Sequence, residues 1–254
     1  MMRASTFMWP LSEYKTVMEW SIKTAKECDD SIEIVAVALR PDPTKDPVIM
    51  SHTVTFQNTE DAAIASLKLV NDSRPPGAIM ESVNRVTSLE DEYRDQANAN
   101  PGGHRYTSDN AYIDNDADVA EVLREAFTTL PENSKTFALW YSMDPCSTRE
   151  LPDMAVSMQS NHYLAIYTIW EHETDDERCK GWVKNVMKGV EKHSVGAYLG
   201  DSDFQVRRTK FWENSKAKKL MGLRRKWDPT GRICGYLDEG DKSGTVGLEN
   251  VHEW

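Results

Sequence analysis

Apolar residues recur at helical spacing in three stretches of the chain. After Thr174 they run from Cys179 to Val190, and a weaker stripe extends from Ser12 to Lys26. Acidic residues precede the stripe from Cys179 to Val190, at the helix start where the dipole favours negative charge. The plainest stripe follows Asp116 and consists of Val119, Val122, Leu123, Ala126, Phe127 and Leu130. The pattern therefore predicts three helices, each with one buried face.

Two further helices are marked by their ends. Asn58 is expected to cap a helix that runs through Val70 and stops before Pro75-Pro76-Gly77. Another helix is predicted from about Asn214 to Trp227, because a proline at position 229 cannot continue it. Runs rich in β-branched and aromatic residues predict strands at Ile32 to Leu39, Val48 to Phe56, Phe137 to Met143, Tyr163 to Trp170 and Val195 to Leu199.

The connections between these strands favour antiparallel pairing. Short polar segments, 41–47 and 144–153, join neighbouring strands, and a parallel pair would need a longer crossover. Thr53 and Thr55 alternate with Val54 and Phe56, so one side of the sheet need not be apolar. We predict an α+β fold with one large antiparallel β-sheet and helices packed on one face. The other face is left for a ligand or a second domain.

The domain organisation is expected to be simple. An arrangement of helix, two strands and helix is faintly visible in each half, but its spacing is too irregular to define a repeat family. The polar segment from Glu90 to Ser108 is interpreted as a surface loop and not as a domain boundary. Residues 1–254 are therefore predicted to form a single domain of the substrate-binding type.

Composition excludes several classes of function. The chain has 254 residues, is 39% hydrophobic and carries a net charge of −11, which is typical of a globular protein and disfavours nucleic acid and anionic membranes as partners. It contains no apolar run of about 18 residues and no secretory leader at its start, so a cytoplasmic location is expected. Its 4 cysteines are too widely spaced for a metal or redox motif.

Several stretches are similar to one enzyme family. Lys210-Phe211-Trp212-Glu213-Asn214 leads through a basic helix to Trp227-Asp228-Pro229, and the chain then closes with Gly247-Leu248-Glu249 and Glu253-Trp254. The turn Tyr198-Leu199-Gly200-Asp201-Ser202-Asp203-Phe204 and the strand His162 to Trp170 add to the likeness. Together these stretches resemble the fungal branch of the berberine-bridge-enzyme-like, FAD-linked oxidoreductases. Residues 210–254 are similar to the C-terminal motif and tail of that family.

This resemblance implies that the chain is the C-terminal substrate domain of such an enzyme, with the FAD-binding domain missing. The family's substrate domain is a broad antiparallel sheet roofed by helices, and it lies over the reactive face of the flavin. The chain contains no Gly-x-Gly-x-x-Gly after a strand and no Walker-type phosphate loop. We therefore expect no cofactor in this chain, and FAD only if a separate domain supplies it. Gly200 departs from the family, which commonly has Asn at this position.

Candidate site residues lie on and around the strand that leads to Trp170. Tyr163 and Tyr167 share one side of it and could position or deprotonate a phenolic substrate if a cation lowered their pKa, and Glu171 just beyond the strand could act as an acid or base. Packing of the two rings, and a solvated Glu171, explain the same pattern. Predicted substrate-binding residues are Trp140, Ser142, Gln159, Asn161 and Tyr198, with Tyr141 beside them on the neighbouring strand.

Three functions remain open at this point. The first is the substrate half of an FAD-linked oxidoreductase of fungal secondary metabolism, active when a flavin domain is supplied. The second is a flavin-independent isomerase or cyclase that acts on a reactive natural-product intermediate by positioning and acid-base catalysis. The third is a non-catalytic binder or an inactive truncated product. The expected partners are a small-molecule substrate and either a flavin domain or a second copy of the chain.

Overall fold

The computed structural model describes residues 1–42, 45–132, 134–147, 149–203, 207, 209–230 and 232, and only the backbone of Pro145 and Cys146. The expected tail, with Gly247 to Glu249 and Glu253-Trp254, lies outside the described residues, as does Phe204 of the predicted turn. No helix in the described part of the chain is long and apolar enough to cross a membrane.

The first half of the chain forms a β-α-β-β-α-β unit. Its strands are β1 (Met2–Pro10), β2 (Ile32–Leu39), β3 (Val48–Phe56) and β4 (Met80–Thr87). Its helices are α1 (Tyr14–Glu27), entered through a 3-10 turn at Leu11–Glu13, and the consecutive α2 (Glu60–Ser66) and α3 (Lys68–Ser73). The hydroxyl of Thr59, and not the expected Asn58, caps α2 by accepting from the Ala62 amide at 3.2 Å.

The second half repeats the same order. Its strands are β5 (Arg105–Ile113), β6 (Phe137–Ser142), β7 (His162–Trp170) and β8 (Ser194–Gly196). Its helices are α5 (Val119–Thr128) and α7 (Asp176–Val190), with 3-10 turns at Glu173–Asp175, Glu191–His193 and Leu199–Asp201. Outside the two units lie α4 (Leu89–Ala99), the short α6 (Asp144–Ser147) and α8 (Asn214–Trp227).

The two units join edge to edge into one sheet. The strand order is β4-β1-β3-β2-β6-β7-β5-β8 and every neighbouring pair is antiparallel. Each unit therefore has the split βαβ order of a ferredoxin-like motif. The seam is the pairing of β2 with β6, from Val35 opposite Tyr141 to Ala38 opposite Ala138. The predicted antiparallel sheet is confirmed, and its strands come from a duplicated unit.

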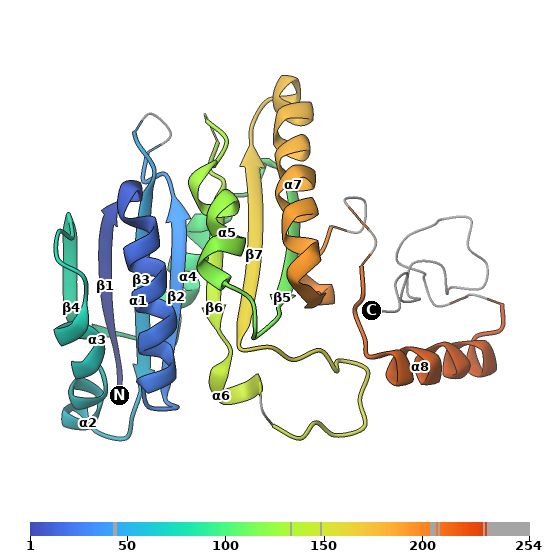
Figure 1. Ribbon diagram of the computed structural model, residues 1–254, viewed down its shortest axis with the longest axis horizontal. Coiled ribbons are helices and arrows are strands. Elements are labelled where there is room, and N and C mark those ends of the chain that lie inside the picture. The colour runs from blue at the N-terminus through green and yellow to red at the C-terminus, as the bar shows by residue number, and fades with distance from the viewer. Residues whose placement is uncertain are drawn as a thin grey trace.

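One face of the sheet is covered by helices, chiefly α1, α5 and α7, with α2 and α3 beside α1. Figure 1 shows α1, α5 and α7 side by side in front of the strands. Phe7 and Trp9 of β1, Trp140 of β6 and Leu164 of β7 are fully buried beneath these helices in a single cluster. Burial of such side chains contributes roughly 1.5–3 kcal/mol each. The expectation that helices cover one face is confirmed for this main layer.

The structure corrects the prediction for the segment from Glu90 to Ser108. This segment contains α4 and the start of β5 and is not a loop. It was missed because α4 buries no residue and so has no apolar stripe. α4 lies behind the sheet in Figure 1, and Glu92 on it reaches His52 of β3, on the face opposite the main helices.

The polar residues of β3 also face the unexpected way. Thr53 and Thr55 are buried on the helix side, opposite Ile34 and Ile32, whereas Phe56 points to the other face and is 69% exposed. The Thr55 hydroxyl accepts from Ser66 of α2 at 3.0 Å, which satisfies it. The predicted alternation of polar and apolar residues in β3 is confirmed, but the threonine side of the strand faces the helices and not the other face of the sheet.

Trp140 offers a test of the helix-side core. Its indole is buried and donates to Nδ1 of His162 at 3.3 Å. We predict that Trp140→Ala lowers the free energy of unfolding by about 3–5 kcal/mol, measured by urea denaturation. Trp227→Ala is the control, because Trp227 is 73% exposed, and it should change stability by less than about 0.5 kcal/mol. Equal effects of the two substitutions would contradict this placement.

Candidate functional site

A row of side chains crosses the sheet on the face opposite the main helices. Tyr163 on β7 lies directly opposite Tyr141 on β6 and Tyr112 on β5. Tyr141 lies opposite Val35 on β2, which lies opposite His52 on β3. Directly opposed residues of neighbouring strands share a face, so these side chains form one line. We call this side of the sheet the tyrosine face.

The phenols on this face form a connected cluster around one carboxylate. The Tyr163 hydroxyl donates to Oδ2 of Asp201 at 2.6 Å, and the same carboxylate is close enough to Tyr167 to raise the pKa of its phenol. The Tyr112 and Tyr163 rings meet at 5.2 Å, and Tyr167 stacks on Phe137 at 4.9 Å. We call Tyr112, Tyr141, Tyr163 and Tyr167 the tyrosine cluster. The structure thus brings Tyr163 and Tyr167 together, as expected from their spacing.

Burial and negative charge keep these phenols protonated. Burial is the main cause that raises the pKa of Tyr163 and of Tyr167, and the Asp201 carboxylate raises both further. Burial, helped by Glu33 and Asp201, raises the pKa of Tyr141 to about 12. The nearby charge is therefore an anion and not the cation that deprotonation would need. At neutral pH the tyrosine cluster can bind and orient by hydrogen bonds but supplies no preformed phenolate base.

Tyr198 lies over the turn that carries Asp201. Its side chain is 41% exposed, and a Cβ added to Gly200 would stand 2.7 Å from its ring. Glycine at position 200 therefore allows the ring to lie against the turn, which gives a physical reason for the departure from the family's Asn. Beside the ring, Tyr112, Met158 and Trp212 line a cavity of about 10 Å³, room for roughly one water molecule.

The structure does not bring Trp140 and Ser142 into this site. Trp140 belongs to the core beneath the helices, and Ser142 shares its side of β6 because strand residues alternate. The prediction that they wall a pocket beside Tyr163 is therefore corrected. Tyr141, which lies between them, is the residue of β6 that reaches the tyrosine face.

Gln159 and Asn161 lie in the loop before β7 and not on the strand. The Gln159 amide donates to the Arg149 carbonyl at 2.9 Å, and the Asn161 backbone amide donates to Oδ1 of Asn115 at 2.8 Å. These bonds hold the loop against its surroundings. Whether either residue touches a substrate stays a prediction.

Glu171 lies at the far end of β7. It lies eight positions after Tyr163, which corresponds to about 26 Å along an extended strand. Its carboxylate is exposed and lies 3.2 Å from Nε2 of His104. The structure therefore separates Glu171 from the tyrosine cluster, so it cannot act on the same reacting atom as Tyr163.

The first unit carries a different polar group at the matching position. His52 on β3 corresponds to Tyr163 on β7, since both stand in the same cross-strand row of their unit. Its Nδ1 lies 2.8 Å from the Thr6 hydroxyl and its Nε2 lies 3.0 Å from Glu92 of α4. Burial raises the pKa of the neighbouring Glu33 carboxyl, and the nearby His52 opposes that effect.

The glycines of the described residues do not gather into a loop that could cradle a pyrophosphate. Glycines with positive φ are Gly77, Gly103 and Gly196, which are scattered along the chain. At Gly196 the space is filled by Met158 and the Lys210 carbonyl. Among the described residues no group of His, Cys, Asp and Glu is arranged to hold a metal ion.

Comparison with known proteins identifies relatives. No family model matches the chain. It is 30% identical over 236 residues to the FAD-linked oxidoreductase penO of Penicillium crustosum and 28% identical over 236 residues to janO of Penicillium janthinellum. These alignments cover 92% and 91% of this chain, respectively. The chain is related to the fungal FAD-linked oxidoreductases. It spans about half, 52%, of the length of these curated relatives.

The solved structures agree in fold. One neighbour is 6-hydroxy-D-nicotine oxidase from Arthrobacter nicotinovorans, with 14% identity, a TM-score of 0.69 and coverage of 92% of this chain and 53% of that one. Another is a berberine-bridge-enzyme-like protein of Physcomitrella patens in its D396N form, with 12% identity, a TM-score of 0.66 and coverage of 90% and 51%. The antiparallel sheet and its helices therefore have the substrate-domain fold of berberine-bridge-enzyme-like oxidoreductases.

The raised pKa of Tyr141 predicts how stability changes with pH. An unfolded phenol loses its proton near pH 10, whereas the folded protein keeps it to about pH 12, so stability falls as pH rises between these values. Tyr141→Phe removes that proton. The stability of the variant should therefore fall less steeply with pH than that of the parent. The difference between the two is at most about 1.4 kcal/mol per pH unit, because solvent screens a half-buried phenol.

The measurement is urea unfolding at about pH 9 and about pH 11. Both the parent and Tyr141→Phe should lose some stability over this range, because both contain other buried phenols. Tyr93→Phe is the control, since this ring is 68% exposed, and it should lose as much stability as the parent. If Tyr141→Phe and the parent lose the same free energy of unfolding between the two pH values, the pKa of Tyr141 is not raised in the folded protein and the prediction is wrong.

Proposed function

We propose that this chain is the substrate-binding half of an FAD-linked oxidoreductase, and that its tyrosine face forms one wall of the cavity where the flavin ring meets a substrate. The flavin would be held by a flavin-binding domain, in the same polypeptide or in another. The observation that carries the proposal is the cross-strand row of phenols on the face that α1, α5 and α7 leave uncovered.

The chemistry of this face suits binding and orientation. The aromatic rings and the apolar Val35 and Ala165 favour a flat, largely apolar molecule. The Tyr163 proton is directed to Asp201, so the free lone pairs of its oxygen are available to accept a hydrogen bond from a ligand hydroxyl or N–H group. Tyr141 makes a second neutral hydroxyl available beside it.

The flavin would supply the two-electron acceptor when bound. The chain's own residues would then hold the substrate against that ring, exclude water from the contact and fix which substrate atom lies beside Tyr163. Protonated phenols next to Asp201 support an orienting role, because a base would need a lower pKa.

Secondary metabolism is part of this proposal. The relatives named above are oxidoreductases, and one fold neighbour, 16% identical with a TM-score of 0.69 and coverage of 90% of this chain and 54% of that one, is GilR, described as catalysing the terminal step of gilvocarcin biosynthesis. An aromatic natural product of similar character suits the tyrosine face. The isomerase or cyclase alternative gains no support from these relatives, and a non-catalytic binder becomes one outcome of the test.

The proposal is tested with a hybrid enzyme. The half of penO that matches this chain is replaced by residues 1–254, and bound flavin is measured by absorbance after desalting. We expect the hybrid to retain one flavin per polypeptide, while the chain alone, mixed with FAD and desalted, stays colourless. Tyr163→Phe in the hybrid should shift the flavin absorbance bands, whereas Tyr93→Phe should leave them unchanged.

Two results would contradict the proposal. Stoichiometric FAD retained by the chain alone would place the cofactor site within these residues. A hybrid whose flavin spectrum is the same with and without the Tyr163 hydroxyl would show that the tyrosine face does not meet the flavin, which would favour a separate binding role.

A further inference from the structure

We propose that Asn110 is the positioning residue that holds the turn Tyr198–Ser202 on β5 and thereby places the Asp201 carboxylate against Tyr163. Its relevance to substrate binding rests on the proposed function, but the contact that it controls can be measured without flavin or substrate.

The argument begins where the backbone ladder between β5 and β8 ends. The two strands pair only at Ile113 with Ser194 and at Tyr112 with Gly196, with a register shift between them. Beyond Gly196 the segment leading to Tyr198 has no strand partner in the described residues. A peptide group at the edge of a sheet still needs a donor and an acceptor.

The Asn110 side chain supplies both. Its Oδ1 accepts the Tyr198 amide at 2.7 Å, and its Nδ2 donates to the Tyr198 carbonyl at 2.8 Å. This pair of bonds imitates the two bonds that an opposing strand residue would make. Asn110 is fully buried, so loss of these bonds would leave buried polar groups without partners.

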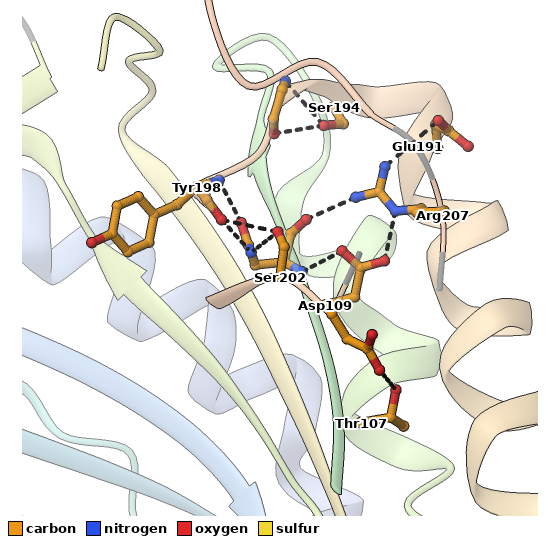
Figure 2. Close-up of polar contacts among 10 residues, drawn as sticks. Thr107, Asp109, Glu191, Ser194, Tyr198, Ser202 and Arg207 are labelled. Carbon is orange, nitrogen blue, oxygen red and sulfur yellow. Dashed lines mark hydrogen bonds and ion pairs between the residues drawn. The ribbon is translucent and has the colours of Figure 1, made fainter. Parts of the chain in front are cut away.

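Asn110 also reaches the other end of the turn. Its Nδ2 donates to the Ser202 hydroxyl at 3.0 Å, and that hydroxyl lies 3.0 Å from the Tyr198 carbonyl oxygen. One amide group therefore holds both ends of the five-residue turn, and Asp201 lies within that turn. Figure 2 shows this network, with the Tyr198 ring pointing away from it.

The neighbouring residues hold the backbone of Asn110 itself. The Arg207 guanidinium donates to Oδ2 of Asp109 at 2.7 Å and to the Asn110 carbonyl at 2.8 Å. Asp109 also accepts the Asn110 amide at 2.7 Å. Its carboxyl is 2% exposed, and the Arg207 charge opposes the rise in its pKa that burial causes. This buried ion pair fixes β5 at the point where Asn110 projects.

A second contact holds the turn farther along the chain. The Thr107 hydroxyl donates to the Asp203 carboxylate at 2.8 Å, and the Asp203 amide donates to the Ser108 carbonyl at 3.0 Å. These bonds lie after the turn and do not reach Tyr198. Thr107→Val therefore distinguishes general anchoring of the segment from the specific placement that we assign to Asn110.

The test follows the Tyr163 phenol by NMR in the full chain labelled at Cζ of tyrosine, with the Tyr163 signal assigned by Tyr163→Phe. Asp201→Asn defines the signal position when the charged acceptor is lost. We expect Asn110→Ala to move the Tyr163 signal at least half of the way to that position. In the Asp201→Asn background, Asn110→Ala should move it no further, because both substitutions remove the same contact.

Asn71→Ala is the matched control for stability. Asn71 is also a buried asparagine, 8% exposed, and donates to Asn84 in the first unit, far from Tyr163 in the sheet order. Asn71→Ala should lower stability and leave the Tyr163 signal in place. Thr107→Val should move the Tyr163 signal less than Asn110→Ala does. An unmoved Tyr163 signal in a folded Asn110→Ala protein would overturn the proposal.

If Asn110→Ala does not fold, Ser202→Ala decides the matter. It removes the bond from Nδ2 to the far end of the turn and the contact of that hydroxyl with the Tyr198 carbonyl, but leaves both bonds between Asn110 and Tyr198. We therefore expect a smaller shift of the Tyr163 signal in the same direction. No shift in Ser202→Ala would overturn the assignment. Because none of these readings involves flavin, failure here is separate from failure of the hybrid enzyme.

Discussion

The register between β2 and β6, where the two units join, determines which side chains lie on each face of the sheet. Val35 pairs with Tyr141 and Ala36 with Trp140, which sends Tyr141 to one face and Trp140 to the other. A slip of one residue would exchange the faces of every side chain in one unit. The tryptophan core beneath the helices and the phenols opposite them therefore depend on the same pairing, and Ala36 and Ala38 are buried in that core.

That constraint explains why a polar row can be tolerated on a large sheet. The main core lies between the strands and the helices of one face, chiefly α1, α5 and α7, so the fold does not need an apolar second face for its stability. Each phenol on the tyrosine face still loses solvation, as the raised pKa values of Tyr163 and Tyr141 show. Asp201 offsets this cost for Tyr163 by accepting a hydrogen bond from its hydroxyl, so the turn that bears Asp201 must be held in place.

Much of the fold could be predicted from the sequence where periodicity is strong. The strands Ile32–Leu39 and Val48–Phe56 and the helix Asn214–Trp227 were placed at the observed ends, because apolar runs, turn residues and a proline mark them. The strands β1, β4 and β5 were missed. β4 is an exposed edge strand, and β5 contains Asp109 and Asn110, whose burial depends on partners about 90 residues away in sequence. Local patterns carry no information about such partners.

The site residues could be predicted where the pattern of a single strand is sufficient. Tyr163 and Tyr167 follow from alternation along one strand, whereas Trp140 was placed on the wrong face because the register between strands is not visible in a single strand. Tyr112 could not be found, since its strand was not predicted. Asp201 lies within a turn that the sequence did single out, but its contact with Tyr163 spans 38 residues and requires the finished sheet.

The two units place different polar groups at the centre of the same cross-strand row. In both units the central residue of the row meets a carboxylate from the segment after the fourth strand, Glu92 for His52 and Asp201 for Tyr163. In the first unit that segment is the helix α4, and the imidazole has both nitrogens engaged, by Thr6 and Glu92. In the second unit it is a short 3-10 turn, and the Tyr163 hydroxyl donates its one hydrogen bond to Asp201, which leaves its oxygen lone pairs as acceptors. The two positions therefore differ in chemistry and not in exposure, since Tyr163 is only 7% exposed. Both His52 nitrogens are engaged, whereas the Tyr163 oxygen keeps the capacity to accept a hydrogen bond, which favours the tyrosine face as the one that binds a ligand.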